Sequence, residues 1–306
     1  MHQVTIVTAF FDIGRENFRT LPRSSEVYFE HFHFWARIQN PLVVYTSRQF
    51  RERILEIRSE FGLGDLTKVF VIDDPFAIQP EIFARMSEVS RDHWFRDFRL
   101  LPHATSGIAE YSYLMLLKSW FVSNAVSRGV TTETAAWIDF GFNHGGVAYP
   151  HTEEFDFAWR CEKDEYDKVV LFSMDEYDDR PIFEIVRRLS DCLMGAQIII
   201  PSRRASELWD VNRESMQTLL RVGLIDDDQL IQMMSLRARP ELFEVRRSEW
   251  FRPLKDVSGA ALTLTAPQEP AIPLRPVRTL VRWSRRQRRA LQSSARLYVN
   301  LVKGRP

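Results

Sequence analysis

Cysteine is scarce in this sequence, and so are long apolar runs. The chain has two cysteines in 306 residues, Cys161 and Cys192, which are too few for a disulfide framework and match no metal-binding spacing. The apolar stretch at the amino terminus has no basic residue before it, so it predicts a β-strand rather than a signal peptide. No run is long enough to cross a bilayer. We therefore expect a cytoplasmic protein, soluble or peripheral at the inner face of the cytoplasmic membrane.

Lysine is rare as well, with 6 residues against 35 arginines. Planar guanidinium groups suit phosphate recognition, although the codon usage of a GC-rich genome explains most of these arginines more simply. The formal charge of the whole chain is zero, but residues 270–306 carry ten basic and no acidic side chains, which leaves −10 on residues 1–269. The sequence therefore predicts an acidic body and a strongly basic tail.

Short segments rich in β-branched and aromatic residues alternate with longer amphipathic stretches, which is typical of an α/β fold with a mainly parallel sheet. Four prolines in residues 258–276 indicate a linker or a surface strap, so we divide the chain into residues 1–257, 258–276 and 277–306. The predicted strands are 4–10, 42–46, 68–72, 136–140, 169–173 and 197–200, and the predicted helices are 26–38, 48–61, 111–127, 182–189, 205–222 and 228–236.

Ligands of open α/β sheets bind at the carboxyl ends of the strands, and the first strand ends in a polar turn. Around this turn, Thr8, Ala9, Phe11 and Arg15 could contact the base and ribose of a nucleotide. A simple turn with solvated charges is the alternative, and it is favoured when this turn is considered alone because no glycine-rich phosphate loop is present.

A second polar loop follows the apolar strand that ends near Asp139, in the sequence WIDFGFNHGG. A carboxylate at a strand end can hold a divalent metal, Mg²⁺ or Mn²⁺, which neutralises a diphosphate leaving group. We therefore predict Asp139 as a metal ligand and catalytic residue, His144 as a second ligand for Mn²⁺, and Gly141 as a neighbour of the ligand. A carboxylate that caps a turn is the alternative.

Acidic residues also precede the predicted helix 228–236, in the sequence IDDDQ. At least one of Asp226, Asp227 and Asp228 can cap this helix, and one of the three can face an acceptor hydroxyl as a general base or orienting group. Lys118 lies on an amphipathic stretch and could reach a donor phosphate, although a solvent-facing lysine is the more common case.

Together, TIVTAFFDIGR, the Lys118 helix, WIDFGFNHGG, MGAQIIIPS, DDDQ and PELFEV resemble the HtrL/WlaTC family of bacterial proteins regarded as glycosyltransferases. The resemblance covers roughly the first 250 residues and leaves the tail outside. It implies a GT-A-type fold, a nucleoside-diphosphate sugar donor such as a UDP-sugar, and a divalent cation at an Asp-x-Asp signature. Here Gly141 stands in place of the second aspartate of that signature, so the second metal ligand is missing from its usual position.

The resemblance also implies individual roles. It favours Asp228 over its two acidic neighbours at the acceptor side, and it places Gly195 and Gln197 in a small-residue loop, 194–197, beside the bound sugar. The expected acceptor is a hydroxyl of a bacterial surface glycan or a lipid-linked precursor. A nucleotidyltransferase and a non-catalytic carbohydrate-binding protein remain as alternatives.

The basic tail, 277–306, predicts an imperfect amphipathic helix. Basic residues next to apolar ones favour contact with an anionic membrane surface. Docking on the acidic body and a disordered tail are the alternatives. No RNA- or DNA-binding motif accompanies the tail, so we expect no nucleic-acid partner.

Overall fold

The structure is a computed structural model that describes residues 1–18, 22–100, 105–176, 178–188 and 192–265. Residues 1–265 form one compact unit, and the predicted basic tail lies outside the described residues. The strands are β1 His2–Gln3, β2 Thr5–Phe10, β3 Leu42–Thr46, β4 Thr67–Val71, β5 Thr134–Ile138, β6 Arg160–Cys161, β7 Val169–Ser173, β8 Leu193–Pro201 and β9 Phe243–Arg247. The α-helices are α1 Ser25–Trp35, α2 Arg51–Glu60, α3 Pro80–Arg91, α4 His93–Phe98, α5 Ala109–Ser127, α6 Ile182–Arg188, α7 Ala205–Arg221, α8 Asp228–Ala238 and α9 Pro253–Ser258.

Seven strands form the central sheet in the order β4-β3-β2-β5-β8-β7-β9. Strand β8 runs antiparallel to both of its neighbours, and every other neighbouring pair is parallel. The carboxyl ends of β2 and β5 therefore lie side by side at one edge of the sheet. This topology confirms the predicted α/β fold with a mainly parallel sheet.

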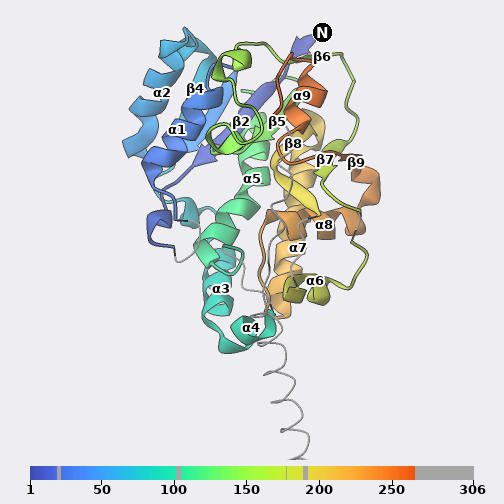
Figure 1. Ribbon diagram of the computed structural model, residues 1–306. Coiled ribbons are helices and arrows are strands. Elements are labelled where there is room, and N and C mark those ends of the chain that lie inside the picture. Colours follow the sequence, from blue (N-terminus) through green and yellow to red (C-terminus); the bar gives the residue numbers. More distant parts are fainter. Residues whose placement is uncertain (19–21, 101–104, 177, 189–191, 266–306) are drawn as a thin grey trace, which may run out of the picture. The chain divides into compact units, whose positions relative to one another are not determined.

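Helices cover both faces of this sheet (Figure 1). On one face α3, α5, α7 and α8 bury apolar side chains such as Met86, Phe121 and Met216. On the other face α1, α2 and the segment after β5 bury Phe32, Ile54 and others. The sheet thus separates two apolar cores, as expected when strands are buried on both faces.

The structure corrects one predicted strand and one predicted loop. Residues 136–140 were predicted as a strand, but β5 ends at Ile138, so Asp139 belongs to the following loop. The small-residue loop predicted at 194–197 is wrong, because these residues lie inside β8, whose nine residues are all buried. The pairing of β8 with β7 changes register between the pairs Val170–Ile199 and Phe172–Met194, so the strand is irregular there but continuous.

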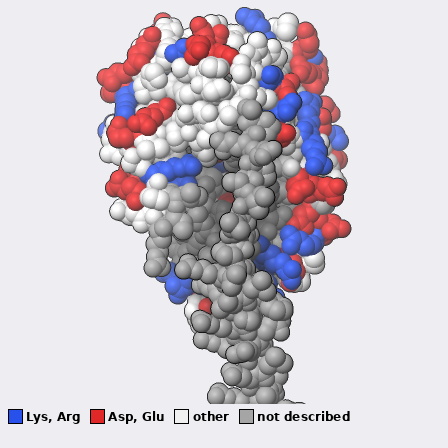
Figure 2. All heavy atoms as spheres, in the orientation of Figure 1, with Lys and Arg blue, Asp and Glu red and all other residues white. Residues whose placement is uncertain are grey.

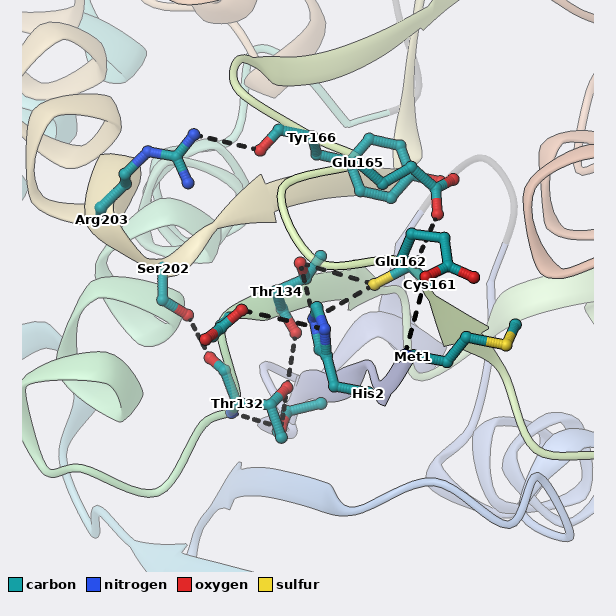
Figure 3. A network of polar contacts seen from close by, with 12 residues as sticks. Met1, His2, Thr132, Thr134, Cys161, Glu162, Glu165, Tyr166, Ser202 and Arg203 are labelled. Carbon is teal, nitrogen blue, oxygen red and sulfur yellow. Dashed lines mark hydrogen bonds and ion pairs between the residues drawn. The ribbon is translucent and has the colours of Figure 1, made fainter.

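A polar network lies at the amino ends of β2 and β5 (Figure 3). The imidazole of His2 lies 3.2 Å from both the thiol of Cys161 and the hydroxyl of Thr134. These contacts tie the short pair of β1 and β6 to the start of β5. Burial raises the pKa of the Cys161 thiol, which keeps it protonated, so the network fastens the amino terminus rather than providing a nucleophile.

Residues beyond the predicted boundary at 257 continue to pack on the same unit. Helix α9 is followed by an extended segment in which Thr263 hydrogen bonds to Glu154. The backbone N–H of Thr265 donates to the carbonyl of Ala148 at 2.8 Å.

Acidic and basic side chains are interspersed on the face shown in Figure 2. No helix among the described residues is both long enough and apolar enough to span a membrane.

Candidate functional site

A cavity of about 450 Å³ opens at the carboxyl ends of β2 and β5. Its walls come from the turn after β2, helices α1 and α5, the loop after β5, the start of β8 and the start of α8. Most of the residues predicted for the site line it, and these are Ala9, Phe11, Arg15, Lys118, Asp139, Gly141, His144, Gly195, Asp227 and Asp228. The remaining two, Thr8 and Gln197, are fully buried and do not line the cavity.

In the wall of this cavity Lys118 joins two predicted acids. Its ammonium nitrogen Nζ lies 2.8 Å from Oδ1 of Asp139 and 2.7 Å from Oδ2 of Asp228. The same nitrogen donates to the carbonyl oxygen of Gly195 at 2.9 Å. An ammonium has three protons, and this geometry provides an acceptor for each of them. Lys118 therefore faces the site rather than the solvent, unlike most helix lysines.

Asp139 and Asp228 differ in their surroundings. The side chain of Asp139 is 34% exposed and also accepts a 2.6 Å hydrogen bond from the indole of Trp137. The side chain of Asp228 is 9% exposed. Burial raises the pKa of Asp228, the negative charge of Asp139 raises it further, and Lys118 opposes both effects. The raised pKa of Asp228 suits a group that accepts a proton.

Burial acts to lower the pKa of Lys118, but the charges of Asp139 and Asp228 outweigh burial and raise it. The ammonium form is therefore maintained at neutral pH. With both carboxylates ionised, the three groups together carry a formal charge of −1. A proton on Asp228 would cancel this charge, in agreement with the direction of its pKa shift.

The three consecutive aspartates before α8 have separate partners. Asp226 forms a buried ion pair of 2.8 Å with Arg99, and burial raises its pKa to about 6. Asp227 caps the helix, since its carboxylate accepts from the backbone N–H of Gln229 at 3.2 Å. Asp228 contacts Lys118. The sequence left the capping residue undecided, and the structure assigns the cap to Asp227.

Gly195 makes the contact between β8 and α8 possible. A Cβ atom added at this position would lie 1.9 Å from Oδ2 of Asp228, far inside contact distance. The missing side chain therefore leaves space for a carboxylate of the protein itself.

The loop after β5 holds its histidine in an unusual conformation. Asn143 and His144 both have positive φ, 61° and 44°. The buried amide of Asn143 accepts from the backbone N–H groups of Ala148 and Tyr149 and donates to the carbonyl of Tyr149, each at 2.9 Å. These bonds compensate for the strain of the left-handed residues and point His144 into the cavity.

His144 stays uncharged at neutral pH. Burial lowers its pKa to about 4, and the positive charge of Arg23 contributes in the same direction. Its ring centroid lies 5.6 Å from that of His31, whose pKa burial also lowers to about 4. A neutral imidazole can donate or accept one hydrogen bond to a bound ligand.

Two arginines line the cavity near β2, and sequence reasoning found only one of them. The guanidinium carbon of Arg15 lies 5.7 Å from the ring centroid of Tyr28 and 5.2 Å from that of Tyr111, and the guanidinium donates to the Tyr28 hydroxyl. The backbone N–H of Arg23 donates to the carbonyl of Arg15 at 3.4 Å, which ties the two residues together. Arg23 escaped prediction because it stands outside any strand-end pattern.

The residues present do not fit a metal site held by the protein alone. Among the described residues, no group of three or more histidine, cysteine, aspartate or glutamate side chains could hold a metal ion. Asp139 and His144 both line the cavity, but Oδ1 of Asp139 already accepts from Lys118 and Trp137. Asp139 and His144 therefore have no third protein ligand beside them among the described residues.

Residues 2–256 match a family described as "Bacterial protein of unknown function (HtrL_YibB)". The chain is 31% identical over 266 residues to protein HtrL of Escherichia coli strain K12, and the match covers 81% of this chain and 90% of that protein. Among solved structures, the apo form of mouse xyloside xylosyltransferase 1 is similar, with a TM-score of 0.41 and 13% identity. That match covers 86% of this chain and 94% of the mouse chain, and it does not bear on the reaction.

Proposed function

Because this chain belongs to the HtrL_YibB family, whose description leaves the reaction open, we propose a function from the site itself: glycosyl transfer from a nucleoside diphosphate donor to a hydroxyl group. The observation that carries this proposal is the position of Lys118, Asp139 and Asp228 in one cavity with Arg15 and Arg23. Anion-binding and proton-accepting groups thus stand together at the carboxyl edge of an α/β sheet, where such folds bind nucleotides.

The reaction requires the site to stabilise a leaving group and to accept a proton. As the acceptor oxygen bonds to the anomeric carbon, the bond from that carbon to the phosphate oxygen breaks and the nucleoside diphosphate leaves with the electron pair. Arg15 and Arg23 suit the charge of this leaving group, because guanidinium groups bind phosphate oxygens in pairs. The acceptor hydroxyl loses a proton, and Asp228 is the carboxylate whose environment favours taking it.

For the partners we keep the substrates predicted from the sequence. We propose a UDP-sugar as donor, and a bacterial surface glycan or its lipid-linked precursor as acceptor. The cavity of about 450 Å³ is large enough for a small-molecule ligand. Location at the inner face of the cytoplasmic membrane is part of the same proposal and depends on the basic tail.

Two alternatives differ in their products. A nucleotidyltransferase would release pyrophosphate, whereas a glycosyltransferase releases nucleoside diphosphate. A non-catalytic binding protein would bind nucleotide sugars without turning them over. A panel of donors assayed for both released products therefore separates all three functions.

Asp139→Asn tests the assignment within the same assay. We expect at least about a hundredfold loss of nucleoside diphosphate release, because a charged group at the reacting centre becomes neutral. The control is Asp210→Asn, which removes an exposed acid of α7 that lies outside the cavity. Equal turnover by Asp139→Asn and the wild type would remove Asp139 from the catalytic residues.

A further inference from the structure

We infer that Lys118 takes the place of a divalent cation beside Asp139 and joins this acid to Asp228, so that protein cations alone bind the diphosphate of the donor. This inference rests on the proposed function and specifies how the site handles the charge of the donor. It also opposes the metal dependence that the family resemblance implies.

The first argument is the number of acceptors around Lys118. All three ammonium protons have an oxygen within 2.9 Å, namely Asp139 Oδ1, Asp228 Oδ2 and the Gly195 carbonyl. This is how carboxylate and carbonyl oxygens surround a bound cation. The ammonium thus connects a strand-end acid with a helix-start acid and neutralises part of their charge.

The second argument is that Lys118 cannot easily move aside. Its side chain is 4% exposed and starts from the middle of the 19-residue helix α5. The ammonium also lies 5.8 Å from the ring centroid of Trp137. A divalent cation on the same carboxylate oxygens would stand within a few ångströms of this fixed positive charge, and the repulsion is strong in a partly desolvated site.

The third argument is that other cations are available for the phosphates. Arg15 and Arg23 both line the cavity, and the rings of Tyr28 and Tyr111 hold the guanidinium of Arg15 in place. A positioned guanidinium loses little rotamer freedom when it binds phosphate. The nucleotide sugar can therefore bind through hydrogen bonds from nitrogen atoms of the protein. No metal ion is needed to bridge the protein and the phosphates.

Titration of metal-free, full-length protein with Mn²⁺ tests the inference without any nucleotide. We expect no stoichiometric uptake by the wild type. Lys118→Met, once circular dichroism shows that it is folded, should take up one Mn²⁺, because its two carboxylates lose their partner. Lys163→Met, at an exposed position outside the cavity, is the control and should behave as the wild type. Stoichiometric Mn²⁺ binding by the wild type overturns the inference, and so does a folded Lys118→Met without uptake.

Calorimetry with UDP tests the consequence for the donor. We expect the Kd in EDTA to stay within about threefold of the value in Mn²⁺, and Arg15→Met and Arg23→Met each to weaken binding about tenfold. Arg85→Met, at an exposed ion pair on α3, should leave the Kd unchanged. A larger loss in EDTA overturns the inference while the proposed function stands. If no nucleotide of a UDP, GDP, ADP, CDP and dTDP panel binds under either condition, the proposed function fails, and the Mn²⁺ titration alone then decides the inference.

Discussion

The carboxylate of Asp228 occupies the space in which a side chain of residue 195 would begin, with Oδ2 at 1.9 Å from the Cβ position of Gly195. Strand β8 and helix α8 can meet here only because this position is a glycine. The contact also brings the Gly195 carbonyl and the Asp228 carboxylate to the same ammonium group of Lys118.

Gly195→Ala should therefore damage the site and the fold together. We expect a loss of about 1–3 kcal/mol in the free energy of unfolding, typical of overpacking, and loss of nucleoside diphosphate release because Asp228 must move away from Lys118. Denaturant unfolding and the release assay measure the two effects. Gly107→Ala is the matched control, since its Cβ would have an ordinary contact of 3.8 Å with Phe95. Equal stability of both variants would contradict the close approach.

Asn143 gives a second prediction, because its side-chain amide and its backbone conformation affect the free energy of unfolding separately. Asn143→Gly removes three buried hydrogen bonds but tolerates the positive φ, and we expect it to cost about 2–4 kcal/mol. Asn143→Ala should cost about 1 kcal/mol more, since alanine is strained at this φ. Thermal unfolding of both variants provides the comparison. If alanine proves no worse than glycine, the backbone at this position is not left-handed.

His31, which is buried, and His144, which is partly buried, predict a pH dependence of stability. Their pKa values are near 4 in the folded protein against a normal value of 6.5, so between these pH values the unfolded chain binds more protons. Their contribution therefore favours folding above pH 6.5 and is lost as the pH falls to about 4. Asp226, whose pKa burial raises to about 6, acts in the opposite direction.

Substitution isolates the histidine contribution from that of Asp226. The double variant His31→Gln with His144→Asn should lose less stability than the wild type between pH 7 and pH 4.5, by about 1–2 kcal/mol after allowance for solvent screening. Urea unfolding at several pH values measures the difference. His93→Gln, at an exposed position on α4, serves as the control. Parallel curves for the double variant and the wild type would show that both histidines titrate normally.

The basic tail gives a prediction that depends on sequence alone. The full-length chain should sediment with vesicles rich in phosphatidylserine, because each basic residue near an anionic surface contributes about 1 kcal/mol. A chain that stops before Pro270 should remain in the supernatant, and neutral phosphatidylcholine vesicles should retain neither form. Equal sedimentation of the two chains would remove the tail as a membrane contact.

The strands of the sheet were predictable where burial is complete on both faces. β3 and β7 were predicted at their observed bounds because each is a continuous apolar run. β9 was missed because charged residues interrupt its sequence, FEVRR, and its edge position exposes them. β8 was shortened because residues 194–197 resemble a small-residue loop of the family, and packing against α8 explains the glycine there.

The sequence identified individual residues of the candidate site but not the contacts between them. Strand-end polarity identified Asp139, and the acid-rich helix start identified Asp228. No local pattern indicates that Lys118, 21 positions before Asp139 and 110 before Asp228, joins them. Its helix also carries other polar residues on several sides, so burial of this lysine depends on tertiary packing that one sequence does not reveal.

The polar network of His2, Thr134 and Cys161 has a practical consequence for handling the protein. It fastens the amino terminus at the end of β2 opposite the cavity, and the six residues of that strand span about 20 Å. A fusion partner or a surface linker attached ahead of residue 1 would thus emerge on the side away from the cavity. Immobilised in this orientation, the protein would present its open cavity to the solution, as binding measurements on a sensor chip require.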